Sequence, residues 1–321
     1  MQNESQIQLG QDGRLRHLLT LEDLNKNIIE NILHTAKRFV NSKKISEKEK
    51  KIFQSSTVAN LFFEPSTRTR GSFEIASKLL GCNSINIDIK NSSEKKGETL
   101  LDTVKTIQSL GVNFLIVRHS ESGSLNLITQ EIGDKCIVIN AGEANVSHPT
   151  QGLLDLLTIS QTNKSFNNLI VTIIGDISHS RVARSTIHGL TTMGVKEIRL
   201  VAPEEFSVIE RITPICKNFE NIDEGLLDAN VVMALRIQHE RIKNSKKIKA
   251  LNNYFENFGL TQKRMKLASP DAIIMHPGPM NRDVEIESSL ADGSQSVILQ
   301  QVANGVAIRM ALLMELLTQH D

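Results

Sequence analysis

Short runs of apolar residues, rich in isoleucine and valine, recur along the chain and constrain its fold more than any other feature. Eight such runs stand at Val58–Phe63, Ser84–Ile89, Asn113–Val117, Cys136–Ile139, Leu169–Ile174, Ile198–Val201, Asn230–Leu235 and Ala272–Met275. Segments with helical spacing of apolar residues lie between most of them, so the pattern predicts alternating strands and helices. Runs that are apolar throughout are typical of parallel strands covered by helices on both faces.

The length of the chain predicts two domains. A chain of 321 residues is long for a single hydrophobic core, and the eight predicted strands fall into two groups of four. We predict an α/β fold of two doubly wound domains, each with a parallel four-stranded sheet, linked by two interdomain helices. The predicted boundary follows residue 148, because Pro149 can open a helix there. Residues 1–148 and 149–299 form the two predicted domains, and a last apolar helix completes the first with residues from about 300 to 321.

The charge balance excludes several classes of function. Lys and Arg number 37 and Asp and Glu number 36, so the net charge of +1 gives no global field for nucleic acid or an anionic membrane. Aromatic content is 4% with no Trp, which disfavours base-stacking platforms for single-stranded nucleic acid. No apolar run approaches the length of a membrane span. We expect a soluble, cytoplasmic protein without nucleic-acid or membrane partners.

The three cysteines, Cys82, Cys136 and Cys216, lie far apart and show no C-x-x-C spacing. This distribution is typical of reduced thiols and disfavours a metal site or a disulfide framework.

One turn concentrates the groups that bind phosphate. Three hydroxyls and two arginines stand within five residues, Ser66-Thr67-Arg68-Thr69-Arg70, directly after the first predicted strand. Apolar residues recur downstream at helical spacing as far as Gly81, so the hydroxyls are predicted at a helix N-terminus, where free N–H groups and the macrodipole favour an anion. The alternative is an ordinary N-cap with two solvent-facing arginines. The density of hydroxyls and guanidiniums favours a phosphate ligand, although no Walker A glycines and lysine precede them.

Further polar clusters follow other predicted strands, at the carboxyl ends where open α/β sheets bind ligands. They are the loop 91–99, Arg118-His119, His148-Pro149-Thr150-Gln151, the turn 175–181, Arg236-Ile237-Gln238 and His276-Pro277-Gly278-Pro279. Each has an ordinary structural alternative when taken alone, such as a surface loop, a surface ion pair or a capping histidine. Their joint placement at strand ends is what indicates a site.

Four of these segments resemble the signature motifs of the catalytic chains of aspartate carbamoyltransferases: Ser66–Arg70, His148–Gln151, Arg236–Gln238 and His276–Pro279. The resemblance runs through essentially the whole chain after the N-terminal tail. All carbamoyltransferases, including the ornithine enzymes, share the first motif, so it indicates the donor only. Arg236 and Gln238 resemble the pair that grips the second carboxylate of aspartate, and the Ser-Met-Gly and His-Cys-Leu-Pro segments typical of ornithine enzymes do not occur here.

The resemblance also implies roles for individual residues. The implied carbamoyl phosphate-binding set is Ser66, Thr67, Arg68, Thr69, Arg118, His148, Gln151 and the main chain of Pro277 and Gly278. The implied aspartate-binding set is Lys96, Arg181, Arg236 and Gln238, and the implied catalytic set is Arg68, Thr69, Lys96, Arg118, His148 and Gln151. Ser92 and Lys96 would reach into the site of a neighbouring subunit. The chain departs from many relatives at Asp283, where a glycine often follows Asn281-Arg282, and at Gly278, where some members carry leucine.

The implied function is therefore aspartate carbamoyltransferase (EC 2.1.3.2), which forms N-carbamoyl-L-aspartate and phosphate in de novo pyrimidine (UMP) biosynthesis. The resemblance implies no cofactor and no metal, and a homotrimer as the smallest complete enzyme, open to a higher assembly with regulatory or dihydroorotase-like chains. Two alternatives remain: a carbamoyltransferase for another amino acid such as ornithine, and a non-catalytic partner that binds a phosphorylated metabolite.

Overall fold

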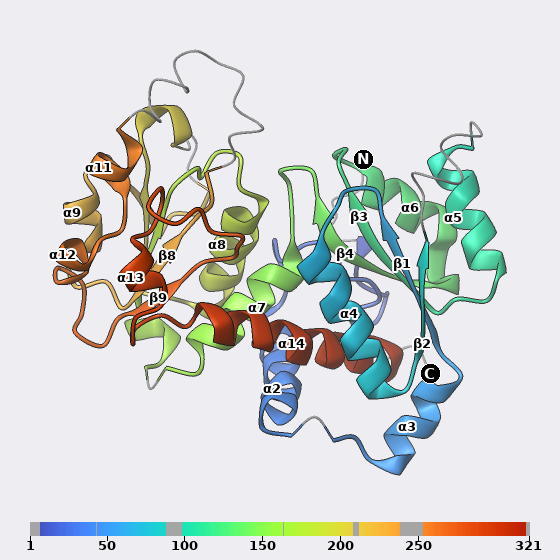
Figure 1. Cartoon of the computed structure of the whole chain (residues 1–321). Helices are drawn as coiled ribbons and strands as arrows, with labels where there is room; N and C mark the ends of the chain where they lie inside the picture. Colours follow the sequence, from blue (N-terminus) through green and yellow to red (C-terminus); the bar gives the residue numbers. More distant parts are fainter. Residues whose placement is uncertain are drawn as a thin grey trace. The chain divides into compact units, whose positions relative to one another are not determined.

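The fold is described from a computed structural model, which describes residues 7–42, 44–87, 98–162, 164–207, 212–237 and 253–318 (Figure 1). The chain forms two compact units. The first comprises the chain up to Leu157 together with the segment from Asn304, and the second runs from Thr158 to Ala303. The division falls inside two helices, α7 (Pro149–Ile159) and α14 (Ile298–Thr318), so each unit begins or ends within a helix.

The first unit is built on a parallel sheet of four strands. They are β1 (Thr57–Phe62), β2 (Asn83–Ile87), β3 (Phe114–His119) and β4 (Ile137–Glu143), in the order β2-β1-β3-β4. Helices α4 (Thr67–Leu80), α5 (Leu100–Ser109) and α6 (Ser124–Ile132) make the crossovers, and α2 (Lys26–Asn41) and α3 (Glu47–Gln54) precede β1. The predicted helix stop is confirmed, because Gly81 caps α4 at φ 87°.

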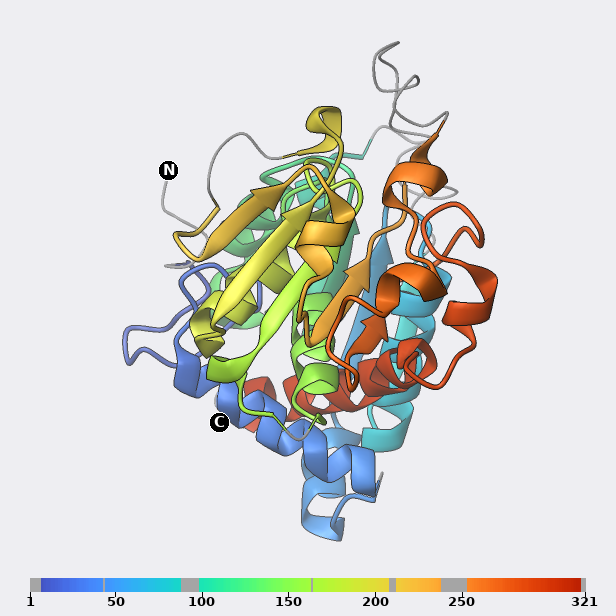
Figure 2. The same ribbon diagram turned by 90° about the vertical axis from the view of Figure 1, so that its left-hand side faces the viewer.

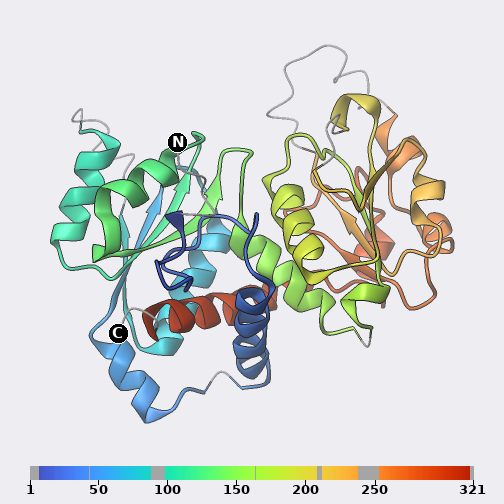
Figure 3. The same ribbon diagram turned by 180° about the vertical axis from the view of Figure 1, so that it is seen from behind.

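Helices cover both faces of this first sheet, as the apolar character of its strands predicts. Figures 1 and 3 show α5 and α6 together on one face, and Figure 1 shows α4 on the other. Val104 of α5 and Ile128 of α6 share a buried core with Leu61 and Leu115 of the strands. On the face of α4, the guanidinium of Arg309 in α14 lies 4.9 Å from the centre of the Phe73 ring. The last helix therefore packs against the first half of the chain.

The second unit is built on a parallel sheet of five strands (Figure 2). They are β5 (Ile170–Ile174), β6 (Glu197–Val201), β7 (Cys216–Phe219), β8 (Val231–Ala234) and β9 (Ile273–Met275), in the order β7-β6-β5-β8-β9. Its described residues include the helices α8 (Arg181–Met193), α9 (Ile222–Leu226), α11 (Tyr254–Phe258), α12 (Gln262–Met265) and α13 (Ser288–Ala291). Figures 1 and 3 show α8 on one face of the sheet and α9 and α12 on the other.

The two parallel sheets confirm the predicted α/β class. The prediction of four strands in the second sheet was wrong, because that sheet has five. The missed strand is β7, whose sequence is Cys-Lys-Asn-Phe. It lies at the edge of the sheet, where Cys216 is buried while Lys217 and Asn218 are exposed. An edge strand faces water along one side and needs no apolar run, so the pattern that marks central strands could not reveal it.

Three single-turn 3₁₀ elements complete the described chain: η2 (Gly133–Lys135), η3 (Phe166–Asn168) and η4 (Glu204–Phe206). In the described ranges, no helix combines the length and the apolar composition that a membrane crossing needs.

Candidate active site

The first group of predicted site residues meets at the carboxyl edge of the first sheet. Because the strands are parallel, β1, β3 and β4 all end at this edge. The helix after β1 and the helix after β3 leave to opposite faces, so these neighbouring strands form the switch point where open α/β sheets bind ligands. The turn 63–69 follows β1, and Arg118 stands near the end of β3 in register with Phe62 of β1. The fold thus brings the phosphate turn and Arg118 together.

The hydroxyl of Ser66 is not used as a helix cap. Ser66 occupies the N-cap position of α4, with φ −157° and ψ 90°, yet within the described chain its side chain makes no capping hydrogen bond. By contrast, Ser46, Thr99 and Ser180 cap α3, α5 and α8 through their side-chain oxygens. The first N–H groups of α4 thus lack the side-chain acceptor that the other three helices have. An anion can take that place, because the helix N-terminus favours negative charge.

Arg118 holds a fixed positive charge beside this turn. Its Nη2 lies 3.3 Å from Oε2 of Glu64, and its Nη1 donates to the carbonyl oxygen of Ala141 at 3.2 Å. These contacts tie the guanidinium to the turn after β1 and to β4 at the same time. Thr69 is buried at the start of α4, whereas Arg68 is exposed. The guanidinium of Arg118 is therefore preorganised, and that of Arg68 stands at the surface of the turn.

His148 and Gln151 lie at the start of α7. His148 is buried, and its Nδ1 lies 3.5 Å from Oγ1 of Thr150. The buried guanidinium of Arg309 donates to the same Thr150 oxygen at 3.4 Å. The side-chain amide of Gln151 is oriented by Asp155, one helical turn later, because its Nε2 donates to Oδ1 of Asp155 at 2.9 Å. That bond directs the amide nitrogen to Asp155 and leaves the amide oxygen as the acceptor for another group.

Two further predicted residues stand at the switch point of the second sheet, between β5 and β8. Arg181 is buried and opens α8 after the turn that follows β5, and Arg236 is half-buried two residues beyond β8. The two chain segments start from adjacent points. A Cβ atom built on Gly175, at φ +130°, would lie 3.0 Å from Cβ and 3.1 Å from the carbonyl oxygen of Leu235. A side chain at position 175 would crowd Leu235, so glycine allows the two segments to approach this closely.

The turn between β5 and α8 is held by buried Asp176. Its Oδ1 lies 2.7 Å from Nδ1 of His179 and accepts from the main-chain N–H of His179 at 3.3 Å. Ser180 then caps α8 by accepting from the N–H of Ala183 at 3.1 Å. These bonds fix the backbone immediately before Arg181.

The turn after β9 carries the predicted main-chain groups of Pro277 and Gly278. His276 is buried and its Nδ1 accepts from the N–H of Gly278 at 2.8 Å, while its Nε2 lies 3.2 Å from Oε1 of Glu285. Pro277 and Gly278 themselves are half-buried.

Asp283, which departs from the glycine expected at this position, has φ 60°. Aspartate is among the few residue types that tolerate this left-handed region, which glycine adopts without cost. Its Oδ1 accepts from the N–H of Ser288 at 2.9 Å and its Oδ2 from the Ser288 hydroxyl at 2.8 Å. Arg282 forms a two-pronged ion pair with Asp292, at 2.7 and 2.8 Å. The side chain of Asp283 thus acts locally, while Asp292 pairs with the neighbouring arginine.

Three predicted residues lie outside the part of the chain that the structure describes: Ser92, Lys96 and Gln238. The described ones form two groups, one in each unit. The first unit holds Ser66, Thr67, Arg68, Thr69, Arg118, His148 and Gln151, and the second holds Arg181, Arg236, Pro277 and Gly278.

Two family models match the two halves of the chain. The family model described as aspartate/ornithine carbamoyltransferase, carbamoyl-P binding domain, matches residues 16–161, and that of the Asp/Orn binding domain matches residues 167–316. The chain belongs to the aspartate/ornithine carbamoyltransferase family.

Solved carbamoyltransferase structures resemble the chain over nearly its whole length. Aspartate transcarbamoylase from Trypanosoma cruzi, in complex with carbamoyl aspartate and phosphate, matches with a TM-score of 0.84 and 26% identity, over 96% of this chain and 98% of that one. The same enzyme with N-(phosphonacetyl)-L-aspartic acid matches with a TM-score of 0.85 and 26% identity, over 96% and 97%. Ornithine carbamoyltransferase from Pyrococcus furiosus matches with a TM-score of 0.82 and 26% identity, over 93% and 96%.

Three acidic side chains that contact predicted site residues or their neighbours were not identified from the sequence: Glu64, Asp155 and Glu285. Two left a usable signal, because Glu64 stands in the phosphate turn itself and Asp155 follows Gln151 by one helical turn. Glu285 left none, since its contact with His276 spans a turn whose path the sequence does not specify. Among the described residues, no group of three or more His, Cys, Asp or Glu is arranged to hold a metal ion.

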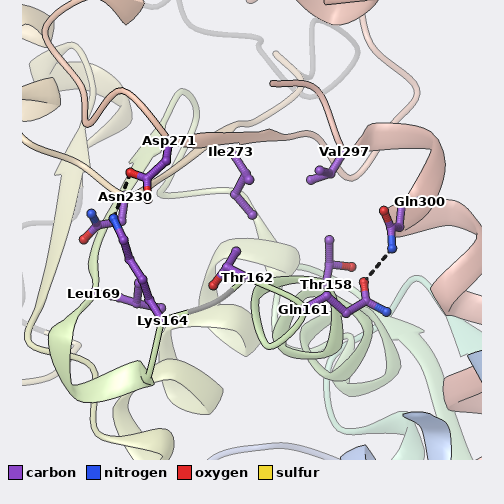
Figure 4. Close-up of a pocket in the computed structure, with 10 residues that line it drawn as sticks. All are labelled: Thr158, Gln161, Thr162, Lys164, Leu169, Asn230, Asp271, Ile273, Val297 and Gln300. Carbon is purple, nitrogen blue, oxygen red and sulfur yellow. Dashed lines mark hydrogen bonds and ion pairs between the residues drawn. The ribbon is translucent and has the colours of Figure 1, made fainter. Parts of the chain in front are cut away.

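A cavity of about 290 Å³ in the second unit lies apart from these residues (Figure 4). Leu169, Asn230 and Ile273 in its wall stand at or just before the first residues of β5, β8 and β9, at the sheet edge opposite Arg181 and Arg236. Figure 4 shows the Lys164–Asp271 ion pair, with 2.8 Å between Nζ and Oδ1, on one side of it. The cavity holds none of the predicted substrate residues.

Proposed function

We propose that this chain is the catalytic subunit of an aspartate carbamoyltransferase (EC 2.1.3.2), acting in de novo pyrimidine (UMP) biosynthesis. It would transfer the carbamoyl group of carbamoyl phosphate to the amine of L-aspartate, giving N-carbamoyl-L-aspartate and phosphate. In this proposal, residues 1–148 and about 300–321 bind carbamoyl phosphate, and residues 149–299 bind aspartate. The observation that carries it is the pair of arginines, Arg181 and Arg236, at the switch point of the second sheet.

The donor site rests on the turn after β1. The phosphate of the donor would take the hydroxyls of Ser66, Thr67 and Thr69 and the guanidiniums of Arg68 and Arg118. The uncapped start of α4 supports this assignment, because a helix N-terminus supplied with hydroxyls and arginines suits a dianion. Glu64 and the carbonyl of Ala141 hold the Arg118 guanidinium beside the turn. Its side chain would therefore lose little conformational entropy when the donor binds.

The carbamoyl amine needs hydrogen-bond acceptors. Gln151 supplies its amide oxygen, since Asp155 engages its amide nitrogen, and the carbonyl oxygens of Pro277 and Gly278 supply two more. Arg118, His148 and Thr69 would donate to the carbamoyl oxygen. This division of donors and acceptors matches a group that carries one oxygen and one NH₂.

The acceptor specificity rests on charge. Aspartate has two carboxylates, and Arg181 and Arg236 offer two cations that can each bind one bidentately, with Lys96 and Gln238 as the remaining predicted ligands. The side-chain ammonium of ornithine would instead require an acidic partner at the place where Arg236 stands. Overall identity does not separate the two activities, because the Trypanosoma cruzi aspartate enzyme and the Pyrococcus furiosus ornithine enzyme both match at 26%. The proposed preference for aspartate over ornithine therefore depends mainly on Arg236.

The reaction would proceed by direct transfer. The aspartate nitrogen attacks the carbamoyl carbon, a C–N bond forms, and the carbonyl oxygen becomes an oxyanion held by Thr69, Arg118 and His148. The C–O bond to phosphate then breaks and the departing phosphate takes the amine proton. One preorganised oxyanion donor contributes about 3–4 kcal/mol to lowering the barrier, and alignment of two substrates roughly 7–11 kcal/mol. No covalent carbamoyl-enzyme forms in this scheme, so isolating one without aspartate would contradict it.

The proposed assembly is a homotrimer, because Ser92 and Lys96 would act in the site of a neighbouring subunit. It leaves open a higher assembly with regulatory or dihydroorotase-like chains. The proposed location is the cytoplasm. Mixing inactive Lys96→Ala chains with inactive Arg68→Ala chains should restore activity in mixed trimers. Verified mixed trimers without any activity would contradict the shared site.

A substrate panel tests the proposal. The purified protein is incubated with carbamoyl phosphate and, separately, L-aspartate, L-ornithine and other amino acids, and products are separated by chromatography. We expect carbamoylaspartate and phosphate in equal amounts. Citrulline would favour the ornithine alternative, and no product with any acceptor, despite phosphate binding, would favour the non-catalytic alternative.

A further inference from the structure

The imidazole of His276 is held at both of its nitrogens inside the second unit. Its side chain has no exposed surface, and the N–H of Gly278 donates to its Nδ1 at 2.8 Å. An imidazole nitrogen that accepts a hydrogen bond carries no proton, so the ring proton must be on Nε2. That nitrogen lies 3.2 Å from Oε1 of Glu285 and donates to it. The two contacts together specify the neutral Nε2–H tautomer of His276.

Glu285 closes the turn that contains these groups. Its side chain is 1% exposed, and the Oε1 atom that faces His276 also accepts from the main-chain N–H of Asn281. The carboxylate of Glu285 thus connects His276, which follows β9, to the main chain of Asn281. A buried carboxylate is costly unless hydrogen bonds compensate it, and these two donors offset part of that cost at Oε1. Its other oxygen, Oε2, is buried and has no hydrogen-bond partner among the described residues.

The orientation of one carbonyl group follows from this arrangement. The N–H of Gly278 and the carbonyl of Pro277 belong to the same peptide unit, and that peptide bond is trans. In a trans peptide the N–H and C=O bonds point in opposite directions. Because the N–H points at the buried imidazole, the Pro277 carbonyl must point away from it. Any rotation of the His276 ring that breaks the bond to Gly278 would free this carbonyl to turn.

We propose that Glu285 is a positioning residue for the carbamoyl group. Its carboxylate fixes the tautomer and orientation of His276, and His276 in turn fixes the direction in which the Pro277 carbonyl accepts the carbamoyl amine. The proposal rests on the proposed function for the identity of the ligand. The chain of contacts from Glu285 through His276 to Gly278 stands on the structure alone.

Three substitutions separate a positioning role from a purely structural one. Glu285→Leu removes the acceptor, and kcat/KM for carbamoyl phosphate should fall roughly 100-fold, the loss expected when a reacting group is misplaced by about 1 Å. Glu285→Gln keeps an oxygen that can accept from both donors, so most of that loss should be recovered. His276→Asn keeps an acceptor near the Nδ1 position for the Gly278 N–H and should also retain more activity than Glu285→Leu.

A matched control comes from the same segment. Asp292→Asn weakens the ion pair with Arg282 and touches neither His276 nor Glu285, so its kcat/KM should stay within about threefold of that of the parent. Inorganic phosphate binding, measured by calorimetry, should be the same in all four variants, because the phosphate residues belong to the first unit. The ¹⁵N spectrum of the histidine side chains should show the Nε2–H tautomer of His276 in the parent and a changed tautomer population in Glu285→Leu.

The result that overturns the proposal is a Glu285→Gln protein as impaired as Glu285→Leu while its His276 spectrum remains that of the parent. A Glu285→Leu protein with parental kcat/KM would overturn it equally. If Glu285→Leu does not fold, the Glu285→Gln and His276→Asn proteins decide, since loss of activity in both with the Gly278 contact retained contradicts the relay. Failure of the proposed function is distinguishable, because the parent would then yield no carbamoylated product while the tautomer measurement still reports on the contacts.

Discussion

Ser66→Ala should separate binding from helix capping, because the Ser66 hydroxyl stands at an N-cap position without capping. A serine that caps a helix contributes about 1 kcal/mol, within a range of roughly 0.5–2 kcal/mol, to the free energy of unfolding. Since the Ser66 side chain makes no such bond to α4 in the described structure, its removal should change that free energy by less than about 0.5 kcal/mol. If the hydroxyl instead binds the donor phosphate, the loss appears in catalysis. A hydrogen bond to a charged group is worth about 1.5–3 kcal/mol, which corresponds to a roughly 10- to 150-fold fall in kcat/KM for carbamoyl phosphate.

The matched control is Ser46→Ala in the same unit. Ser46 closes a capping box: its hydroxyl accepts from the N–H of Glu49 at 3.2 Å, and Glu49 accepts from the N–H of Ser46 at 2.6 Å. Its removal should cost about 1 kcal/mol of unfolding free energy and leave the kinetics unchanged. Urea unfolding followed by circular dichroism and steady-state assays at saturating acceptor measure both quantities. The reasoning is refuted if Ser66→Ala is destabilised as much as Ser46→Ala and keeps full kcat/KM.

Three further outcomes are expected. Arg236→Gln should lower kcat/KM for L-aspartate at least about 100-fold, with inorganic phosphate affinity unchanged by calorimetry; a parental kcat/KM would contradict the assigned contact. Gly175→Ala should destabilise the protein by about 1–3 kcal/mol in thermal unfolding, because the new methyl group would approach Leu235 to 3.0 Å at a φ that L residues rarely adopt; parental stability would show that the two segments can separate freely. Burial raises the pKa of the Cys82 and Cys136 thiols to about 12, so both stay protonated and unreactive at neutral pH. Iodoacetamide should label them only after unfolding, and rapid labelling of the native protein in mass spectrometry would argue against the burial.

The parts of the fold that depend on local pattern were predictable. Parallel strands buried on both faces leave continuous apolar runs, and eight of the nine described strands left such a run. The placement of Arg118 and Arg236 at strand ends also followed, because parallel strands deliver their carboxyl ends to a common edge. The strand β7 was missed, because its exposed Lys217 and Asn218 interrupt any apolar run.

The parts that depend on packing were not predictable. The same hydroxyl of Ser66 can cap a helix or bind an anion, and only the side-chain geometry distinguishes the two uses. The contact between Glu285 and His276 arises from the path of a turn, which no residue spacing encodes. The roles of Lys96 and Gln238 stay predictions, because both residues lie outside the described part of the chain.

The discontinuity of the first unit bears on how the protein is made. The ribosome synthesises residues 304–318 only after the whole second unit, yet this segment supplies Arg309, which lies over Phe73, and Glu315, which accepts a hydrogen bond from Thr35 at 2.6 Å. The first unit therefore cannot complete its core until synthesis of the second has ended. A nascent chain would hold its apolar α4 surface uncovered through most of translation. Any attempt to produce the first unit alone must supply the terminal helix, by fusion or as a separate peptide.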